Sequence, residues 1–313
     1  MTAAPTLDVH GRLSADQVAA VRALVAQATA ADRVGPLSEH VMLHLPRGGD
    51  DRVRNLLVTA DDRLVGYAHL DVTDEVEGSS AELAVLPDAR GHGIGRLLVE
   101  RLLQESPDGR LRLWAHGEHP GAGALAQSMG FRRSRVLWQM RRSLHDPLPE
   151  VHVPDGVEIR TFEVGRDEQA WIEVNNRAFA AHPDQGGWGI EEVQLREAEP
   201  WFDPKGLFLA ERHGRLVGSH WTKVHGGGLR NGHDHPPIGE VYIVGVDPAE
   251  QGKGLGPALT LIGLHHLQQL GLDSVLLYVD ESNGPAIRVY ERLGFTRWAT
   301  DVCWSRGRAQ PAD

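Results

Sequence analysis

Two short glycine-rich segments are the residues of this chain best suited to chemistry. The first is Arg90-Gly-His-Gly-Ile-Gly95 and the second is Gln251-Gly-Lys-Gly-Leu-Gly256. Each follows a strand-like run and opens an amphipathic stretch, which predicts a turn leading into a helix. The first N–H groups of a helix lack intrahelical partners and lie at the positive end of its dipole. Each segment therefore predicts a phosphate or pyrophosphate site, although a glycine-rich turn without a ligand stays open for either one taken alone.

The elements that must position these loops occur twice along the chain. The segment Arg-Leu-Val-Gly occurs at residues 63–66 and again at 215–218, each time in the second strand of an expected hairpin. A further strand, a glycine loop with its helix and a Gly-Phe pair follow in the same order in both halves. This persistence predicts a tandem repeat of one domain. The expected strands are 55–59, 64–70, 81–85, 157–161, 206–210, 215–221 and 240–246.

The order of elements predicts an α/β fold with two domains, each a mixed, mostly antiparallel sheet flanked by helices. We expect an N-terminal domain over 1–143, a proline-rich linker over 144–156 and a C-terminal domain over 157–313. A dinucleotide-binding fold is disfavoured because the strands before the loops look antiparallel and the glycine spacing is too short. No Lys-Ser or Lys-Thr pair closes either loop, which disfavours a P-loop.

Composition narrows the class of partner. The 313 residues carry a formal net charge of −11, which disfavours non-specific binding to nucleic acid. The single cysteine, Cys303, excludes an intrachain disulfide and a cysteine-based zinc site, and its setting is typical of a packed strand. No run of 18 apolar residues and no signal-like N-terminus is present, which predicts a cytoplasmic protein without a membrane partner. A monomer is compatible with the sequence.

Three histidines crowd a Gly-rich loop that the first half lacks: His225, His233 and His235. A His-Asp-His run can bind a metal, but a flexible loop with no other ligands favours a site without metal. We therefore expect no metal.

The second half resembles the acetyl-CoA-dependent N-acetyltransferase (GNAT) superfamily. The resemblance rests on three separate motifs that occur in the order typical of the superfamily: Gln251-x-x-Gly254-x-Gly256, Asn283-Gly-Pro-Ala286 and Tyr290-Glu-Arg-Leu-Gly294-Phe295. The first half matches the same pattern less closely. The resemblance implies acetyl-CoA as co-substrate and a small-molecule amine as acceptor.

Acetyl transfer to an amine needs a neutral amine, a stabilised oxyanion and a proton for the departing thiolate. The resemblance implies Glu240 as the base, the Val244 N–H as the oxyanion donor and Tyr290 as the acid. The alternatives stay open from the residues alone: an exposed strand-end carboxylate, an ordinary buried strand and a core tyrosine.

The resemblance also implies which residues contact acetyl-CoA. In the second half these are Val244, Gly245, Val246, Gln251, Gly252, Lys253, Gly254, Leu255, Gly256, Pro257, Asn283, Gly284, Pro285, Ala286, Ile287 and Arg288. In the first half they are Leu83, Ala84, Val85, Gly91, His92, Gly93, Ile94, Gly95 and Arg96. Asn283 can serve as a helix N-cap, as a cofactor contact or as both, and Arg288 can equally lie on a solvated helix face.

Further sequence segments resemble one family within the superfamily, the tandem mycothiol synthases. They are His182-Pro-Asp-Gln-Gly-Gly-Trp188, His220-Trp-Thr-Lys-Val-His225, the run 239–248, and Trp114-Ala-His-Gly117. The resemblance implies acetyl transfer to the cysteinyl amine of a cysteine–glucosamine–inositol conjugate. It also implies an acceptor site made of Glu39, Asp184, Lys223, Glu240 and Tyr278.

The first half lacks the superfamily's residues at the positions that match the expected acid, base and N-cap of the second half. Ala126 and His119 stand at the positions that match Tyr290 and Asn283, and Ser79 stands opposite Glu240. Glu82 aligns with Ile243, and strict strand alternation puts it on the opposite face from Glu240. We therefore predict that the first half binds acetyl-CoA or serves as scaffold but does not turn over.

Two other functions remain open. One is a GNAT enzyme for another amine, such as an aminoglycoside or a protein N-terminus, which the same loop and tyrosine would suit. The other is a non-catalytic acyl-CoA-binding sensor, which the presence of Glu240, Asn283 and Tyr290 disfavours.

Overall fold

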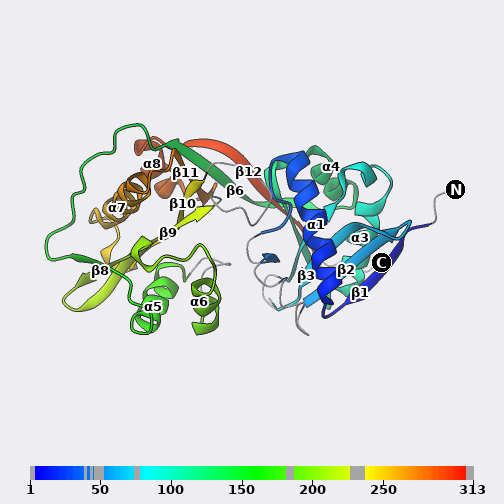
Figure 1. The fold of residues 1–313 in the computed structure, drawn as a ribbon, viewed down its shortest axis with the longest axis horizontal. Helices are drawn as coiled ribbons and strands as arrows, with labels where there is room; N and C mark the ends of the chain where they lie inside the picture. The colour runs from blue at the N-terminus through cyan, green and yellow to red at the C-terminus, as the bar shows by residue number, and fades with distance from the viewer. Residues whose placement is uncertain are drawn as a thin grey trace. The chain divides into compact units, whose positions relative to one another are not determined.

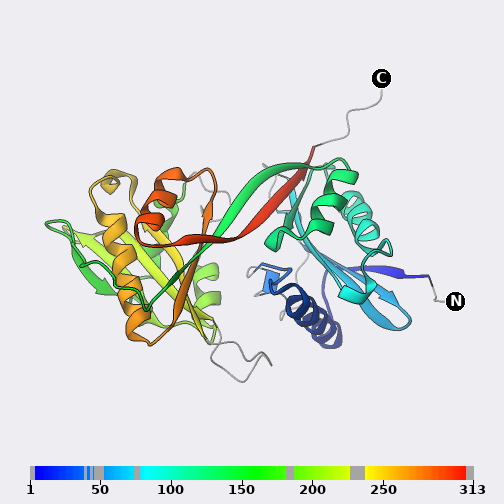
Figure 2. The same ribbon diagram turned by 90° about the horizontal axis from the view of Figure 1, so that it is seen from above.

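The computed structural model describes residues 4–38, 41–42, 45, 53–73, 78–180, 187–225 and 237–307 (Figures 1 and 2). The chain divides into two compact units. Unit 1 comprises Met1–Leu137 with Ala299–Asp313, and unit 2 comprises Trp138–Trp298. Among the described residues, no helix combines the length and apolar character needed to cross a membrane.

Unit 1 is a mixed sheet in the order β1-β2-β3-β4-β5-β12, with β4 and β5 parallel and the other pairs antiparallel. Helices α1 and α3 both pack on β3 and β4. The first part of β6 also belongs to unit 1. The elements are β1 Thr6–His10, α1 Ala15–Asp32, β2 Val53–Ala60, β3 Arg63–Asp71, β4 Ser79–Val85, η2 Pro87–Ala89, α3 Ile94–Glu105, β5 Leu111–Ala115, η3 His116–Glu118, α4 Pro120–Ser128, β6 Arg132–Ser143 and β12 Thr296–Arg306.

Unit 2 repeats this plan in the order β6-β11-β10-β9-β8-β7, with β10 and β11 parallel. The β7–β8, β8–β9 and β9–β10 pairs are antiparallel. The elements are β7 Glu158–Thr161, α5 Glu168–Ala178, α6 Ile190–Glu197, η4 Pro204–Gly206, β8 Leu207–Arg212, β9 Arg215–His225, β10 Ile238–Val246, η5 Pro248–Glu250, α7 Leu255–Gln269, β11 Ser274–Asp280 and α8 Gly284–Arg292. The expected fold class is confirmed.

The two faces of the unit 2 sheet carry different helices. A Cβ on Gly218 would lie 3.0 Å from Leu259 of α7, whereas a Cβ on Gly245 would lie 3.0 Å from Phe179, just after α5. Gly218 pairs with Val246 in the ladder, so Gly245 and Gly218 point to opposite faces. We call the side covered by α5 and α6 face A and the side covered by α7 face B.

The last strand of each repeat is divided between the units. Residues of β6 from Trp138 onward belong to unit 2, and residues of β12 from Ala299 onward belong to unit 1, where Cys303 is buried and pairs with Trp114 of β5. The expected division at 1–143, 144–156 and 157–313 follows the repeat along the sequence. The compact units follow packing instead, and each takes residues from the closing strand of the other repeat.

Candidate functional site: the diverging strands and glycine loop of unit 2

Strands β10 and β11 diverge at the end that leads to the glycine loop. Their parallel pairing runs only from Gly239–Val275 to Val241–Leu277, although β10 continues to Val246. Beyond this point the described residues show no further ladder pair between β10 and β11. A gap between diverging strands can therefore accept an extended ligand along the backbone.

The polarity of the β10 backbone in this gap follows from its pairing with β9. The Asp247 N–H donates to the Val217 carbonyl at 2.8 Å, so alternation points Gly245 toward β9 and directs the peptide groups of Val244 and Val246 toward the gap. The Gln251 side chain, whose Nε2 lies 3.3 Å from the Val246 carbonyl, approaches from that same side. The Val244 N–H therefore points away from β9, and its role as an oxyanion donor stays a prediction.

The glycine loop ends at the start of α7. Gly252 and Gly254 have φ of 76° and 86°, in the left-handed region that favours glycine, and an added Cβ at either would meet nothing within 4 Å. Among the described residues no side chain caps α7, which leaves the N–H groups of Leu255 and Gly256 to an external partner, whereas Pro257 has no N–H. Lys253 adds a cation, 3.3 Å from the Glu250 carboxylate. This geometry suits an anion at the start of the helix.

The loop of unit 1 has the same backbone but different anchors. Gly91 and Gly93 have φ of 78° and 85°, and α3 likewise has no side-chain cap. Arg90 reaches back to the Val85 carbonyl at 3.1 Å, as Gln251 does to Val246, and also forms two 2.7 Å contacts with Asp32. The remaining residues expected at this loop lie around it: Leu83 and Ala84 on β4, His92 between the glycines, and Ile94, Gly95 and Arg96 in the first turn of α3.

Helix α8 carries the other second-half residues of the expected cofactor site. Asn283 caps it, because its Oδ1 accepts the Ala286 N–H at 3.2 Å. Gly284, Pro285, Ile287 and Arg288 follow in the first turns, with Ile287 buried and Arg288 exposed. In unit 1 the matching His119 caps α4 instead, its Nδ1 accepting the Gly121 N–H at 3.1 Å. The N-cap interpretation of Asn283 is therefore correct, and its contact with a cofactor stays a prediction.

Tyr290 lies on α8 and packs edge-on against Phe295, with ring centroids 5.9 Å apart. Burial raises the pKa of Tyr290 to about 12. The phenol therefore keeps its proton at neutral pH, as a hydrogen-bond or proton donor must.

Glu240 is buried in face A of the sheet, only 6% exposed. It pairs directly with Lys223 of β9 and with Leu276 of β11, so these three residues form one row across the strands. Tyr278 lies two residues beyond Leu276 on the same face. The structure thus brings Lys223, Glu240 and Tyr278 together, whereas Glu39 and Asp184 lie outside the described residues.

Aromatic rings enclose the Lys223 ammonium. Its Nζ lies 4.4 Å from the centre of the Trp201 ring and 5.1 Å from that of Tyr242. Burial lowers the pKa of Lys223 to about 8, although the charge of Glu240 opposes the shift. Burial also raises the pKa of Tyr242 to about 12, against the opposing influence of Arg196, whose Nε donates to the Tyr242 hydroxyl at 2.6 Å. The sequence did not single out Trp201 or Tyr242, which reach Lys223 only through packing.

The sequence identifies His225 as a metal candidate and as the last residue of one segment of the family resemblance, and the structure shows a further contact. Its Nε2 lies 2.5 Å from Glu240 Oε2, and its side chain is 39% exposed. His225 stands two residues after Lys223 on the same strand, so period-two alternation alone could have placed it on this face. His233 and His235 lie outside the described residues.

A β-bulge corrects one sequence-based inference. The register of β10 on β9 shifts between Val241 and Ile243, so Glu240 pairs with Lys223 and Ile243 pairs with Trp221, two residues on the same face. Strict alternation along β10 is therefore broken. The expectation that Glu82, the counterpart of Ile243, lies on the opposite face from Glu240 is wrong.

Glu82 is instead buried in an ionic cluster of unit 1. It accepts the Ser38 N–H at 2.5 Å and lies 3.7 Å from His116 Nε2, while His116 Nδ1 lies 3.0 Å from Asp301 of β12. Burial disfavours the charged imidazole, but the two carboxylates outweigh it and raise the pKa of His116 to about 10. Ser79, the counterpart of Glu240 by sequence, is buried on β4.

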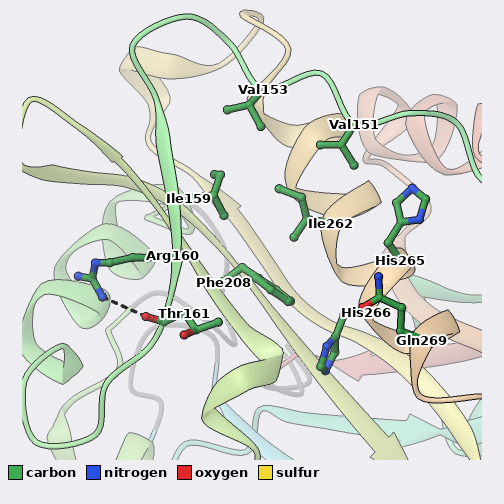
Figure 3. A pocket seen from close by; sticks show the side chains of 10 residues that line it. All are labelled: Val151, Val153, Ile159, Arg160, Thr161, Phe208, Ile262, His265, His266 and Gln269. Atoms are coloured by element: carbon green, nitrogen blue, oxygen red, sulfur yellow. Dashed lines mark hydrogen bonds between the residues drawn. The ribbon is translucent and has the colours of Figure 1, made fainter.

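A hollow of about 450 Å³ opens elsewhere on unit 2, beside α7 (Figure 3). Its lining is mostly apolar, with Phe208, Ile159 and Ile262 facing inward and His265 and His266 along the helix. Arg160 turns away from it toward the Thr161 carbonyl at 3.1 Å. The hollow contains none of the residues of the row or the glycine loop, so it is separate from the candidate site.

Comparison with known proteins identifies the family. The Acetyltransferase (GNAT) family matches residues 169–295, and an Acetyltransferase (GNAT) domain matches residues 52–133. A mycothiol acetyltransferase from Acidothermus cellulolyticus is 58% identical, over 96% of this chain and 94% of the relative. The chain belongs to the mycothiol acetyltransferase family. It is an acetyl-CoA-dependent N-acetyltransferase, and the family resemblance drawn from the sequence is confirmed.

Other mycothiol acetyltransferases agree over almost the whole chain. The relative from Streptosporangium roseum is 54% identical over 95% of this chain and 98% of its own length, and that from Geodermatophilus obscurus is 53% identical over 98% and 100%. Among solved structures, a tandem GNAT protein from the clavulanic acid biosynthesis pathway has a TM-score of 0.72 at 22% identity, covering 98% of this chain and 100% of that one. That similarity shows the tandem fold alone.

Proposed function

We propose that this enzyme transfers the acetyl group of acetyl-CoA to the cysteinyl amine of 1D-myo-inositol 2-(L-cysteinylamino)-2-deoxy-α-D-glucopyranoside, a cysteine–glucosamine–inositol conjugate. The observation that carries the proposal is the buried Glu240 on face A, next to diverging strands and in contact with His225. Identity of 58% to a mycothiol acetyltransferase supports the acceptor. Acetyl-CoA as co-substrate fits a reaction in the cytoplasm.

The glycine loop of unit 2 would hold the pyrophosphate of acetyl-CoA through the N–H groups at the start of α7, with Lys253 adding charge. The peptide groups of Val244 and Val246 would bind the pantetheine arm along β10, in the gap left by β11. The same strand would then place the thioester carbonyl against the Val244 N–H. A single oxyanion donor of this kind is worth about 3 kcal/mol in acyl transfer.

The proton balance assigns a task to each polar group. The acceptor arrives as an ammonium, and Glu240 takes one proton so that the nitrogen lone pair can attack the thioester carbon. His225 receives that proton from Glu240 and releases it to solvent, because its ring spans from the buried carboxylate to the surface. As the C–S bond breaks, the sulfur leaves as a thiolate and takes its proton from Tyr290, which regains one from the nitrogen of the new amide. The products are the amide, the free thiol and one proton.

We infer that unit 1 does not react. It retains the loop with Gly91 and Gly93, but Ala126 stands in place of the tyrosine. Its buried carboxylate, Glu82, is occupied by Ser38 and His116. Burial raises the pKa of Glu82, but the His116 imidazole and the Ser38 N–H outweigh it and lower that pKa, so Glu82 is a poor base for amine activation.

The proposal is tested by acetyl-CoA turnover with the conjugate, an aminoglycoside and a peptide with a free N-terminus, each at equal concentration. The expected result is a kcat/KM for the conjugate at least about 100-fold above the others, the discrimination expected of a site that hydrogen-bonds its substrate. Equal values would show an N-acetyltransferase for another amine. Binding of acetyl-CoA without turnover of any amine would show a sensor.

A further inference from the structure

Strand β6 extends face A of unit 2 beyond Tyr278. The Leu144 N–H donates to the Asp273 carbonyl at 2.9 Å, and the Gln139 side chain donates to the Tyr278 hydroxyl at 2.9 Å. Both contacts fit one antiparallel register of β6 on β11, in which Arg141 stands opposite Leu276. Arg141 therefore lies in the same row as Glu240, two strands away and on the same face.

Arg141 is held differently from its neighbour in sequence. The Arg142 guanidinium points to face B and donates to the backbone carbonyls of Leu293 and Asp146. The Arg141 guanidinium lies 4.5 Å from the Trp298 ring centre, and its buried Nε has no hydrogen-bond partner among the described residues. In the part of the chain that the structure describes, Arg141 also makes no ion pair. A buried donor without a partner is costly, so an external acceptor is expected.

The indole beside Arg141 is unusually open. Trp298 is 65% exposed, more than any other large hydrophobic residue among those described. An exposed aromatic face next to a guanidinium, a phenol and an amide combines an apolar platform with several donors and acceptors. The ring of a sugar or cyclitol has the matching surfaces: apolar C–H groups on its faces and hydroxyls, which both donate and accept, around its edge.

We propose that Arg141, Trp298 and Gln139 extend the acceptor site beyond Tyr278 as a second subsite, which binds a hydroxyl-rich ring attached to the reacting amine. Strands in a sheet lie about 4.8 Å apart, so the subsite is roughly 10 Å across the sheet from the Glu240 strand. That spacing suits a sugar or cyclitol ring that is the first or second unit of the conjugate after the cysteinyl group. The inference rests on the proposed function and adds to it the residues that select the polyol. A single guanidinium over a neutral aromatic surface favours hydroxyls over a phosphate.

The test compares two acceptors in Arg141→Lys and in Trp298→Ala. The first acceptor is the full conjugate and the second is cysteinamide, which has the same amine and no ring. The expected result is an increase in KM for the conjugate of about tenfold or more, with kcat nearly unchanged and cysteinamide kinetics unaltered, because only uniform binding is lost. Arg141→Lys keeps the charge and removes only the planar fork, which makes it the more conservative of the two variants.

The chain offers a matched control on the same two strands. Arg297 lies over Trp138 at 4.8 Å, and both residues alternate with the proposed pair, so they belong to the opposite face. Arg297→Lys and Trp138→Ala should leave KM for both acceptors unchanged. Equal changes in the control pair and the proposed pair would show a general effect on β6 and β12 and would overturn the subsite.

The remaining outcomes are also decisive. A KM for the conjugate unchanged in Arg141→Lys, or equal increases for both acceptors, would refute the subsite. Competitive inhibition of the wild type by inorganic phosphate, relieved in Arg141→Lys, would show an anion site instead. If the wild type does not prefer the conjugate to cysteinamide at all, the proposed function fails, whereas a preference that survives both variants refutes the subsite alone.

Discussion

The two glycine loops share a backbone, and the side chains around them differ. Both loops place glycines at positive φ before an uncapped helix, and both anchor a long side chain on the carbonyl at the end of the preceding strand. In unit 2 the neighbouring face holds Glu240 in contact with a half-exposed His225. In unit 1 it holds Glu82 in a buried ionic cluster with His116. Glu240 can therefore exchange protons with solvent through His225, whereas Glu82 stabilises the fold of unit 1.

The largest difference between the halves should come from Tyr290, which unit 1 replaces with Ala126. Tyr290→Phe removes the proton donor for the thiolate and keeps the packing on Phe295. We expect kcat to fall about 100-fold or more, in the range typical of general acids, with acetyl-CoA affinity unchanged. Steady-state kinetics and calorimetric titration of acetyl-CoA measure the two quantities. An unaltered kcat would remove Tyr290 from the mechanism.

The two loops can be compared by making the same substitution in each. Gly254→Ala and Gly93→Ala both force an alanine into left-handed backbone, at about 1–2 kcal/mol. We expect Gly254→Ala to raise KM for acetyl-CoA by about tenfold through distortion of the phosphate site. Gly93→Ala should change neither KM nor kcat. Equal effects of the two substitutions on turnover would mean that both loops serve the reaction.

Proton transfer from Glu240 to solvent should depend on the His225 side chain. In His225→Ala the carboxylate loses its proton acceptor, and we expect kcat to fall several-fold, to about a tenth of the wild-type value. Free imidazole in the buffer should restore part of the rate, because it can reach the vacated position. A loss that imidazole does not relieve would indicate a purely structural role.

The ionic cluster of unit 1 predicts a pH dependence of stability, not of turnover. The pKa of His116 is raised to about 10, above its usual value near 6.5, so its contribution is fully present below the usual value and is lost as pH rises through about 10. His116→Gln should therefore lower the free energy of unfolding at pH 6 and have little effect at pH 10.5. Urea titrations at both pH values measure this, and a constant difference would contradict the assignment.

Much of this arrangement could be predicted from the sequence because it is local. The repeat, the hairpins and the glycine turns follow from spacing and period, whereas Tyr290 and Asn283 are singled out by the family resemblance. The bulge beside Tyr242 could not be predicted, since an inserted residue leaves no mark on a short apolar strand, and it reversed the face assigned to Glu82. The division of β6 and β12 between the units is a matter of packing between segments far apart in the chain.

Two expected acceptor contacts come from the family resemblance alone. Glu39 and Asp184 remain expected acceptor contacts on the strength of the family resemblance. A fragment of the first half alone would lack part of unit 1, since unit 1 includes Ala299–Asp313 and Asp301 contacts His116. The comparison between the halves is better made in the full chain.

The most direct test of that comparison is the kcat of Glu240→Gln against that of Glu82→Gln, each in the full chain with the conjugate as acceptor. We predict that Glu240→Gln loses about 100-fold or more and that its pH–rate profile loses the acidic limb. Glu82→Gln should keep the wild-type kcat while unfolding at a lower urea concentration. A large loss of kcat in Glu82→Gln, with Glu240→Gln near wild type, would place the reaction in unit 1 and contradict the account.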